Sequence, residues 1–147
     1  MFPFLKRKKA SYPGDSKWMV LEGEYSGKPM FVRRNESAKR LRGHKDYFHR
    51  IGVAIAFLRP NETGLPERDE AEVMDQIEDS LCKAFEEDQT SLQVLAITTN
   101  SMREFVFYSR DPVILQRLEA IQHSFPAYQL TSYVAEDRTW DLYQEFA

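Results

Sequence analysis

The chain has 147 residues, of which 42% are hydrophobic, 13% aromatic and 29% charged. This composition is typical of one globular domain and excludes collagen-like, low-complexity and wholly disordered chains. A chain of this length buries enough apolar surface that it needs neither a structural metal nor a disulfide. The single cysteine, Cys82, cannot form an internal disulfide, which favours a reducing compartment. No apolar stretch approaches the roughly 20 residues of a membrane span, and we expect a cytoplasmic protein.

The net charge is −3, but the charges are distributed unevenly along the chain. Residues 1–50 carry 13 Lys and Arg against 5 Asp and Glu, whereas residues 51–147 carry 7 against 18. Such asymmetry is consistent with a nucleic-acid or membrane contact, or with a basic hairpin that packs beside an acidic helix in one domain. We favour the second interpretation because the total charge is small.

The first third of the chain predicts a tail, a hairpin and a loop. Residues 1–16 are expected to form a basic N-terminal tail, because their apolar residues precede their charges, the reverse of a secretory signal. A single domain is expected over residues 17–147. Within it, β-rich runs over residues 17–25 and 29–35 flank a short glycine-containing turn and predict a β-hairpin. The polar and basic residues 36–47 are predicted to form a loop.

The rest of the chain alternates strand and helix patterns. Residues 50–58 are apolar on both faces, which predicts a strand in the centre of a sheet. Apolar residues at three- and four-residue spacing over 67–88 predict an amphipathic helix with an acidic N-terminus. The remaining predicted elements are a strand pair at 92–99 and 103–109, a helix opened by Asp111-Pro112, a strand at 128–134 and a short helix capped by Asp137.

The order of these elements predicts an α+β fold. Its centre is a ferredoxin-like βαββαβ antiparallel sheet, preceded by an N-terminal β-hairpin that extends one edge and followed by a short C-terminal helix. Right-handed crossovers place both long helices on one face of the sheet. We therefore expect the other sheet face to be open for contact.

Two segments invite comparison with RNA-binding proteins. Phe105-Val106-Phe107-Tyr108 fits the last half of the signature of RNA-recognition modules, but the four residues before it do not fit the first half. Phe105 and Phe107 are better explained as the buried face of a strand. The predicted basic loop has side chains that could neutralise phosphates, namely Lys39, Arg40, Arg42 and Lys45. No aromatic residues separate these charges, so a solvated loop is the favoured interpretation.

Residue spacing indicates neither a metal site nor a catalytic nucleophile. The histidines, His44, His49 and His123, lack the spacing of known zinc motifs. Cys82 lies near the apolar stripe of the predicted helix, where inert packing is the default. No glycine-rich phosphate-binding loop is present. We therefore predict no metal, no cofactor and no catalytic residue.

A few polar residues could share a cleft. Arg33 and Asn35 stand at positions i and i+2 of one predicted strand, so their side chains are expected to point to the same face. Glu78 and Asp79 lie in the middle of the long helix, and two acids with separated pKa values could perform acid–base chemistry. Because residues 67–88 carry ten acidic residues against two basic ones, a solvated helix face is the favoured alternative.

Six short motifs together resemble a known family. In chain order they are Trp18, Phe31-Val32-Arg33-Arg34-Asn35, Gly64-Leu65-Pro66, Ile77-Glu78-Asp79, Thr98-Thr99 with Arg103-Glu104-Phe105-Val106-Phe107-Tyr108, and Glu136-Asp137 with Trp140 and Tyr143. Over residues 18–146 they resemble the bacterial domain-of-unknown-function family 695. Members look like small stand-alone proteins, and some are joined to a domain similar to a ribonuclease E regulator. The resemblance therefore implies a regulatory, protein-binding role in RNA metabolism.

The resemblance also supplies candidate site residues. Those carried over are Arg33, Asn35, Glu78, Asp79, Arg103, Tyr108, Asp137 and Trp140. On physical grounds, Trp140 and Tyr143 are expected to anchor the last helix to the sheet.

Three functions are consistent with the sequence. We favour a non-enzymatic regulatory domain that binds another protein through the open sheet face or an edge strand, because no catalytic signature is present. The second is an enzyme or small-ligand-binding protein, which requires convergence in one cleft of Arg33, Asn35, Arg103, Glu78 and Asp79. The third is an RNA-binding protein that uses the basic loop. The expected partner is another protein, with a second copy of the chain as an alternative.

Overall fold

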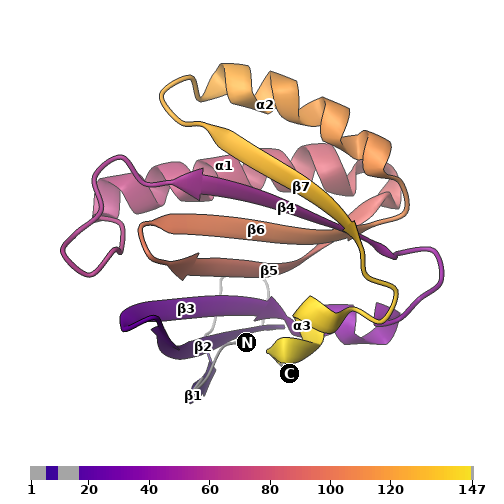
Figure 1. The fold of residues 1–147 in the computed structure, drawn as a ribbon. Coiled ribbons are helices and arrows are strands. Elements are labelled where there is room, and N and C mark those ends of the chain that lie inside the picture. The colour runs from indigo at the N-terminus through magenta and orange to yellow at the C-terminus, as the bar shows by residue number, and fades with distance from the viewer. Residues whose placement is uncertain (1–5, 10–16, 147) are drawn as a thin grey trace.

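Seven antiparallel strands form one sheet in the computed structural model, which describes residues 6–9 and 17–146 (Figure 1). The strands are β1 (Lys6–Lys9), β2 (Trp18–Tyr25), β3 (Lys28–Asn35), β4 (His49–Ala56), β5 (Ser91–Thr99), β6 (Met102–Ser109) and β7 (Leu130–Glu136). Their order across the sheet is β1-β2-β3-β5-β6-β4-β7. The α-helices are α1 (Arg68–Glu86), α2 (Leu118–Ser124) and α3 (Asp141–Glu145). The α+β class predicted from the sequence is confirmed.

A first core lies between the sheet and the two longer helices. The stripe of α1 that faces the sheet consists of fully buried residues at the predicted three- and four-residue spacing, Met74, Ile77, Leu81 and Phe85. Alternate residues of β4 and β6 oppose it, including Ile51, Val53, Ile55, Phe105 and Phe107. Figure 1 shows α1 and α2 on the same side of the sheet. Phe105 and Phe107 are therefore core residues, as the strand pattern predicted.

A second core covers much of the opposite face, so the expectation of an open face is wrong for this part of the sheet. Trp140 is fully buried, and its indole stacks on the ring of Tyr108 at 4.1 Å with an interplanar angle of 7°. The indole N–H donates to the carbonyl of Tyr47 at 2.7 Å. Tyr143 is also fully buried, and its hydroxyl donates to the carbonyl of Asn35 at 2.7 Å. These aromatic residues anchor α3 to the sheet, because the sheet residues beneath them are apolar as well.

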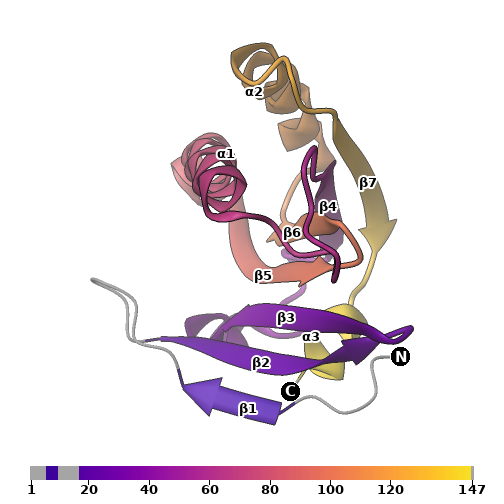
Figure 2. The same ribbon diagram turned by 90° about the vertical axis from the view of Figure 1, so that its left-hand side faces the viewer.

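The longer helices leave part of their own side of the sheet uncovered. Figure 2 shows α1 and α2 over β4 to β7, with β1, β2 and β3 extending beyond α1. The helix-facing side chains of β2 and β3 are correspondingly only half-buried, as in Val20 and Phe31. Among residues 6–9 and 17–146, the sheet surface without a cover thus lies beside α1, on the side that the sequence predicted to be closed.

Several local elements differ from the sequence-based expectation. The predicted loop at 36–47 begins with a 3₁₀ helix over Glu36–Leu41, because the side chain of Asn35 accepts from the backbone N–H of Ser37 and caps a helical turn. The helix after Asp111 also starts with a 3₁₀ turn, Pro112–Arg117. Within the predicted tail, β1 pairs with β2, and the rest of residues 1–16 lies outside the described residues.

Glu70 departs from the expectation that the acidic residues of α1 form a solvated face. Its side chain is fully buried and accepts from the backbone N–H groups of Leu58 and Arg59 at 2.6 and 2.9 Å. The Tyr128 hydroxyl donates to the same carboxylate at 2.8 Å. Glu70 therefore ties the loop after β4 and the segment that precedes β7 to the first turn of α1. In the described residues, none of the helices has the length and apolarity that crossing a membrane demands.

Gly52 allows the ring of Tyr133 to lie across β4. The two residues are partners in the β4–β7 register, and a Cβ on Gly52 would lie 2.1 Å from Tyr133 Cε1. We expect Gly52→Ala to lower the free energy of unfolding by about 1–3 kcal/mol, the usual cost of overpacking, as measured by urea denaturation. In a Tyr133→Ala background the same substitution should cost less, because no ring opposes the new methyl group. Equal losses in both backgrounds would contradict this explanation.

Candidate functional site

A charged groove runs between α1 and the uncovered surface of β2 and β3, with a volume of about 520 Å³. Its polar walls are Arg33, Asp75, Glu78, Asp79, Thr98 and Arg103, and its apolar lining is Val20, Phe31, Ala71 and Ala96. We call this set of residues the charged groove.

The regular spacing of two kinds of element places these side chains together. Asp75, Glu78 and Asp79 stand at positions i, i+3 and i+4 of α1, so they share one helix face beside the buried stripe. Arg33 on β3 and Arg103 on β6 project from the helix side of the sheet. Four of the sequence-predicted site residues, Arg33, Glu78, Asp79 and Arg103, therefore line one groove.

Glu78 joins the sheet to α1 at the wall of the groove. Its carboxylate accepts from the guanidinium of Arg33 at 2.5 Å and from the side-chain amide of Gln93 at 2.7 Å. The Arg33 guanidinium also lies over the ring of Trp18, 5.4 Å from its centroid. Both side chains are mostly buried, with exposed fractions of 23% and 13%, so this ion pair links β3 to α1 at the wall of the groove.

The other end of the groove is organised by Arg103. Its Nε donates to Thr98 Oγ1 at 2.8 Å, and its guanidinium lies 3.7 Å from the carboxylate of Asp75. Partial burial raises the pKa of Asp75, and the nearby charges of Glu78 and Asp79 raise it further, although Arg103 opposes them. Asp79 is exposed at the rim. Three carboxylates and two guanidiniums thus give the groove a net negative charge.

Asn35 does not line the charged groove, so the structure does not bring it together there with Arg33. At the end of β3 its side chain caps the 3₁₀ helix and donates to the carbonyl of Gln93 at 2.9 Å. These hydrogen bonds occupy both ends of the amide and make Asn35 a structural residue at the start of the 3₁₀ helix.

Asp137, Tyr108 and Trp140 form a separate cluster on the opposite sheet face. Asp137 accepts from the Tyr108 hydroxyl at 2.6 Å, from the Arg50 guanidinium at 2.8 Å and from the backbone N–H of Asp141 at 2.7 Å. The N-cap of α3 is Trp140, so the prediction that Asp137 caps this helix is wrong in position, although its carboxylate still accepts from the first backbone N–H of α3. This cluster fastens α3 to the sheet and does not line the charged groove.

The basic loop lies apart from both sets. Its four predicted residues, Lys39, Arg40, Arg42 and Lys45, are exposed, and Lys39 pairs with Glu36 at 3.1 Å. The loop presents positive charge to solvent, and none of the four lines the charged groove.

No group of three or more His, Cys, Asp and Glu side chains that could hold a metal ion occurs among the described residues. The thiol of Cys82 donates to the side-chain carbonyl of Gln93 at 3.0 Å. Burial raises the pKa of Cys82 well above its usual range, and the charges of Glu86, Glu78 and Asp79 raise it further. A thiol in this environment is a packing group with little thiolate at neutral pH.

Two polar residues were not predicted as site residues from the sequence: Asp75, which lines the groove, and Gln93, which donates to Glu78 but does not line it. Asp75 could have been found from its helical spacing, because it precedes Glu78 by three positions. Gln93 carried no usable signal, since its role depends on the approach of β5 to α1.

The burial of Cys82 predicts slow alkylation. We expect iodoacetamide at pH 8 to modify the folded protein far more slowly than the urea-unfolded protein, because only the thiolate reacts. Mass spectrometry of timed samples measures the two rates. Comparable rates in the two states would contradict the raised pKa.

Asp137 predicts a specific dependence of stability on pH. Burial alone would raise its pKa, but the hydrogen bonds from Tyr108, from the backbone N–H of Asp141 and from Arg50 outweigh burial and lower it. A lowered folded-state pKa contributes stability above the unfolded value of about 3.9, and this stability is lost as pH falls below it. We expect Asp137→Asn to lower the free energy of unfolding by about 2 kcal/mol at pH 7. Urea denaturation should show the difference in the free energy of unfolding between wild type and Asp137→Asn becoming smaller between pH 4 and pH 2. A difference that stays constant over this range would contradict the lowered pKa of Asp137.

Almost the whole chain matches one protein family. The sequence profile of a family of unknown function, DUF695, matches residues 16–147. This is the family that the six motifs resemble. No curated protein and no solved structure matches the chain.

Proposed function

Since the chain belongs to DUF695, a family of unknown function, we propose its function from its geometry. We infer that it is a non-enzymatic regulatory domain and that its charged groove binds an extended, positively charged segment of a partner protein. The observation that carries this proposal is the convergence of Asp75, Glu78, Asp79, Arg33 and Arg103 beside an uncovered sheet surface.

The charge of the groove supports a cationic segment. Glu78 is engaged by Arg33, but Asp75 is 68% exposed and Asp79 lies at the rim. Lys and Arg side chains of a partner could therefore pair with these carboxylates without displacing the Arg33–Glu78 pair. Complementary charge of this kind accelerates association and selects between partners.

The shape of the groove supports an extended segment. Val20 and Phe31 provide an apolar floor, and the ion pair and hydrogen bonds of Glu78 and Arg103 hold the walls before a partner arrives. A preformed site loses less conformational entropy when it binds. This placement moves the predicted contact from the face opposite the helices to the uncovered surface beside α1.

We further infer that β4 to β7, with α1 and α2, constitute the predicted ferredoxin-like unit. The strand order β5-β6-β4-β7 and the antiparallel pairing of neighbours support this assignment. The hairpin of β2 and β3 extends the unit beyond β5 and creates the floor of the groove.

A small-molecule ligand is the second candidate occupant. It is favoured by the convergence of four of the five residues that this function requires, and a volume of about 520 Å³ suits a small ligand. The RNA alternative depends on the basic loop, and the excess of carboxylates in the groove disfavours phosphates there.

The peptide proposal can be tested with two labelled probes. One is an extended peptide of alternating Lys and Thr, and the other carries Glu in place of every Lys. We expect the Lys peptide alone to bind in fluorescence anisotropy, and Asp79→Asn to weaken it about threefold, the usual effect of one exposed charge. Higher salt should weaken binding further.

Glu72→Gln is the matched control, because Glu72 is an exposed carboxylate on α1 that does not line the groove. It removes the same charge from the same helix and should leave binding unchanged. Equal binding of both peptides, or equal weakening by Asp79→Asn and Glu72→Gln, would overturn the proposal. If a small molecule binds in the charged groove and the Lys peptide does not compete with it, the small-ligand alternative would be favoured.

A further inference from the structure

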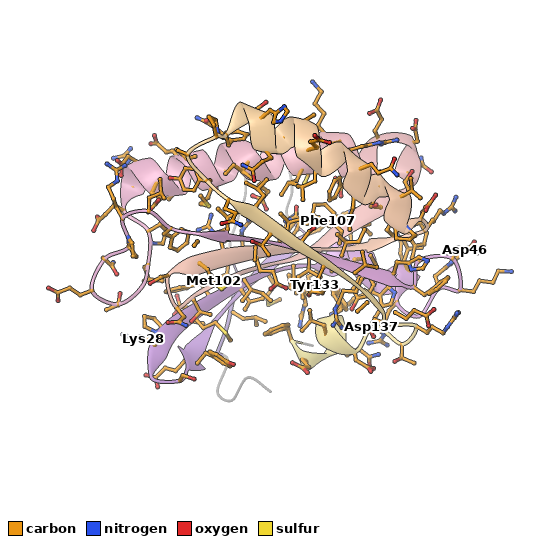
Figure 3. All side chains as sticks on the ribbon, turned by 45° about the horizontal axis from the view of Figure 1, so that its top comes forward. Lys28, Asp46, Met102, Phe107, Tyr133 and Asp137 are labelled. Carbon is orange, nitrogen blue, oxygen red and sulfur yellow. The ribbon has the colours of Figure 1, made fainter. Side chains whose placement is uncertain are left out.

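A second cavity of about 280 Å³ lies on the sheet face opposite the charged groove. It has an apolar wall made by Tyr25, Ile97, Thr99, Met102 and Leu142, and a polar end made by Arg50, Glu104 and Tyr133. Figure 3 shows Met102, Tyr133 and Asp137 along this side of the sheet, whereas Phe107 lies toward the helices. The cavity begins where the cover provided by α3 ends, since Leu142 of α3 forms one wall.

Tyr133 reaches this cavity by crossing a neighbouring strand. It belongs to β7, and its ring passes over Gly52 of β4, where any Cβ would collide with it. Its hydroxyl donates to the carboxylate of Glu104 on β6 at 2.9 Å. Burial raises the pKa of Tyr133 to about 12, and the negative charge of Glu104 adds to the effect. The tyrosine therefore remains a neutral donor that orients Glu104.

Glu104 is the unusual group of the cavity. Burial raises its pKa, although the hydrogen bond from Tyr133 and the charge of Arg50 oppose the rise. Among the described residues, no cationic side chain lies within ion-pair distance of Glu104. The nearby Arg50 is paired instead with Asp137, at 2.8 Å. A half-buried carboxylate without a paired cation is costly, and a cationic ligand would remove that cost.

Arg50, at the same end of the cavity, has one buried nitrogen without a hydrogen-bond partner. Its guanidinium lies over the ring of Tyr133, 5.6 Å from the centroid, and its Nε is buried without a hydrogen-bond partner. The charge of Arg50 is balanced by Asp137, so Glu104 sets the net charge at the polar end of the cavity.

We propose that this cavity binds a small organic amine, whose ammonium group pairs with Glu104 and whose apolar body packs against Ile97, Met102 and Leu142. The rings of Tyr25 and Tyr133 border the cavity and favour a cation over an anion. The cavity is separate from the charged groove, so this inference does not depend on the peptide proposal.

The probes are benzylamine, benzyl alcohol and benzoate, which share one ring and carry a cationic, a neutral and an anionic head. We expect benzylamine to shift the NMR resonances of Thr99, Met102, Tyr133 and Leu142. It should bind at least about tenfold more tightly than the other two probes, because only its ammonium group can form a charge-assisted hydrogen bond with Glu104. Equal affinity for benzyl alcohol, or shifts confined to the charged groove, would overturn the proposal.

Glu104→Gln separates charge from shape, because glutamine can still accept from the Tyr133 hydroxyl. We expect this variant to bind benzylamine about tenfold more weakly and benzyl alcohol with unchanged affinity. The control is Glu136→Gln, an exposed glutamate on the same strand as Tyr133 that does not line the cavity. It should bind benzylamine as wild type does, and wild-type affinity in Glu104→Gln would refute the assignment.

Met102→Trp provides a second test that leaves the polar groups in place. The larger side chain should fill the cavity and abolish benzylamine binding, while resonances of the charged groove stay at their wild-type positions. Retained binding in this variant would place the amine elsewhere and overturn the proposal.

Discussion

The burial of β5 and β6 on both faces is the constraint on which the rest of the structure depends. Successive side chains of a strand point to opposite faces, so a strand that is apolar throughout needs a cover on each side. Phe105 and Phe107 meet α1 and α2, whereas Val106 and Tyr108 meet the aromatic residues of α3. A five-residue helix is enough for the second cover because Trp140 and Tyr143 are large and fully buried.

The sheet is wider than either cover, and both candidate sites lie where a cover ends. The charged groove follows the edge of α1, and the amine cavity follows the edge of α3. The hairpin of β5 and β6 contributes to both, with Thr98 and Arg103 on one face and Thr99, Met102 and Glu104 on the other. Occupants of the two sites would therefore contact the same pair of strands from opposite sides.

The fold also explains the uneven distribution of charge along the chain. Arg33 of the basic hairpin pairs with Glu78 of the acidic helix, which is the arrangement that a small total charge favours. The other acidic residues of α1 serve different purposes, from the buried Glu70 that ties loops together to the exposed Asp79 at the groove rim. The acidic residues of α1 therefore differ in role according to how close each one lies to the sheet.

The sequence alone determined the features that depend on neighbouring residues. These are the strands β2 to β7, the long helix α1 with its buried stripe, and the anchoring aromatic residues near the C-terminus. Each follows from backbone periodicity or local hydrogen bonding, which a single segment specifies by itself. Because Glu78 and Asp79 are adjacent on the long helix, the sequence also identified two of the six polar residues of the charged groove.

Only the tertiary structure decided which distant residues meet. It engaged the Asn35 side chain in capping the 3₁₀ helix, covered much of the sheet face that was expected to be open, and joined Tyr133, Gly52 and Glu104 from three strands. These contacts depend on strand order and register between segments far apart in the chain, because a shift of one residue would send every side chain to the other face.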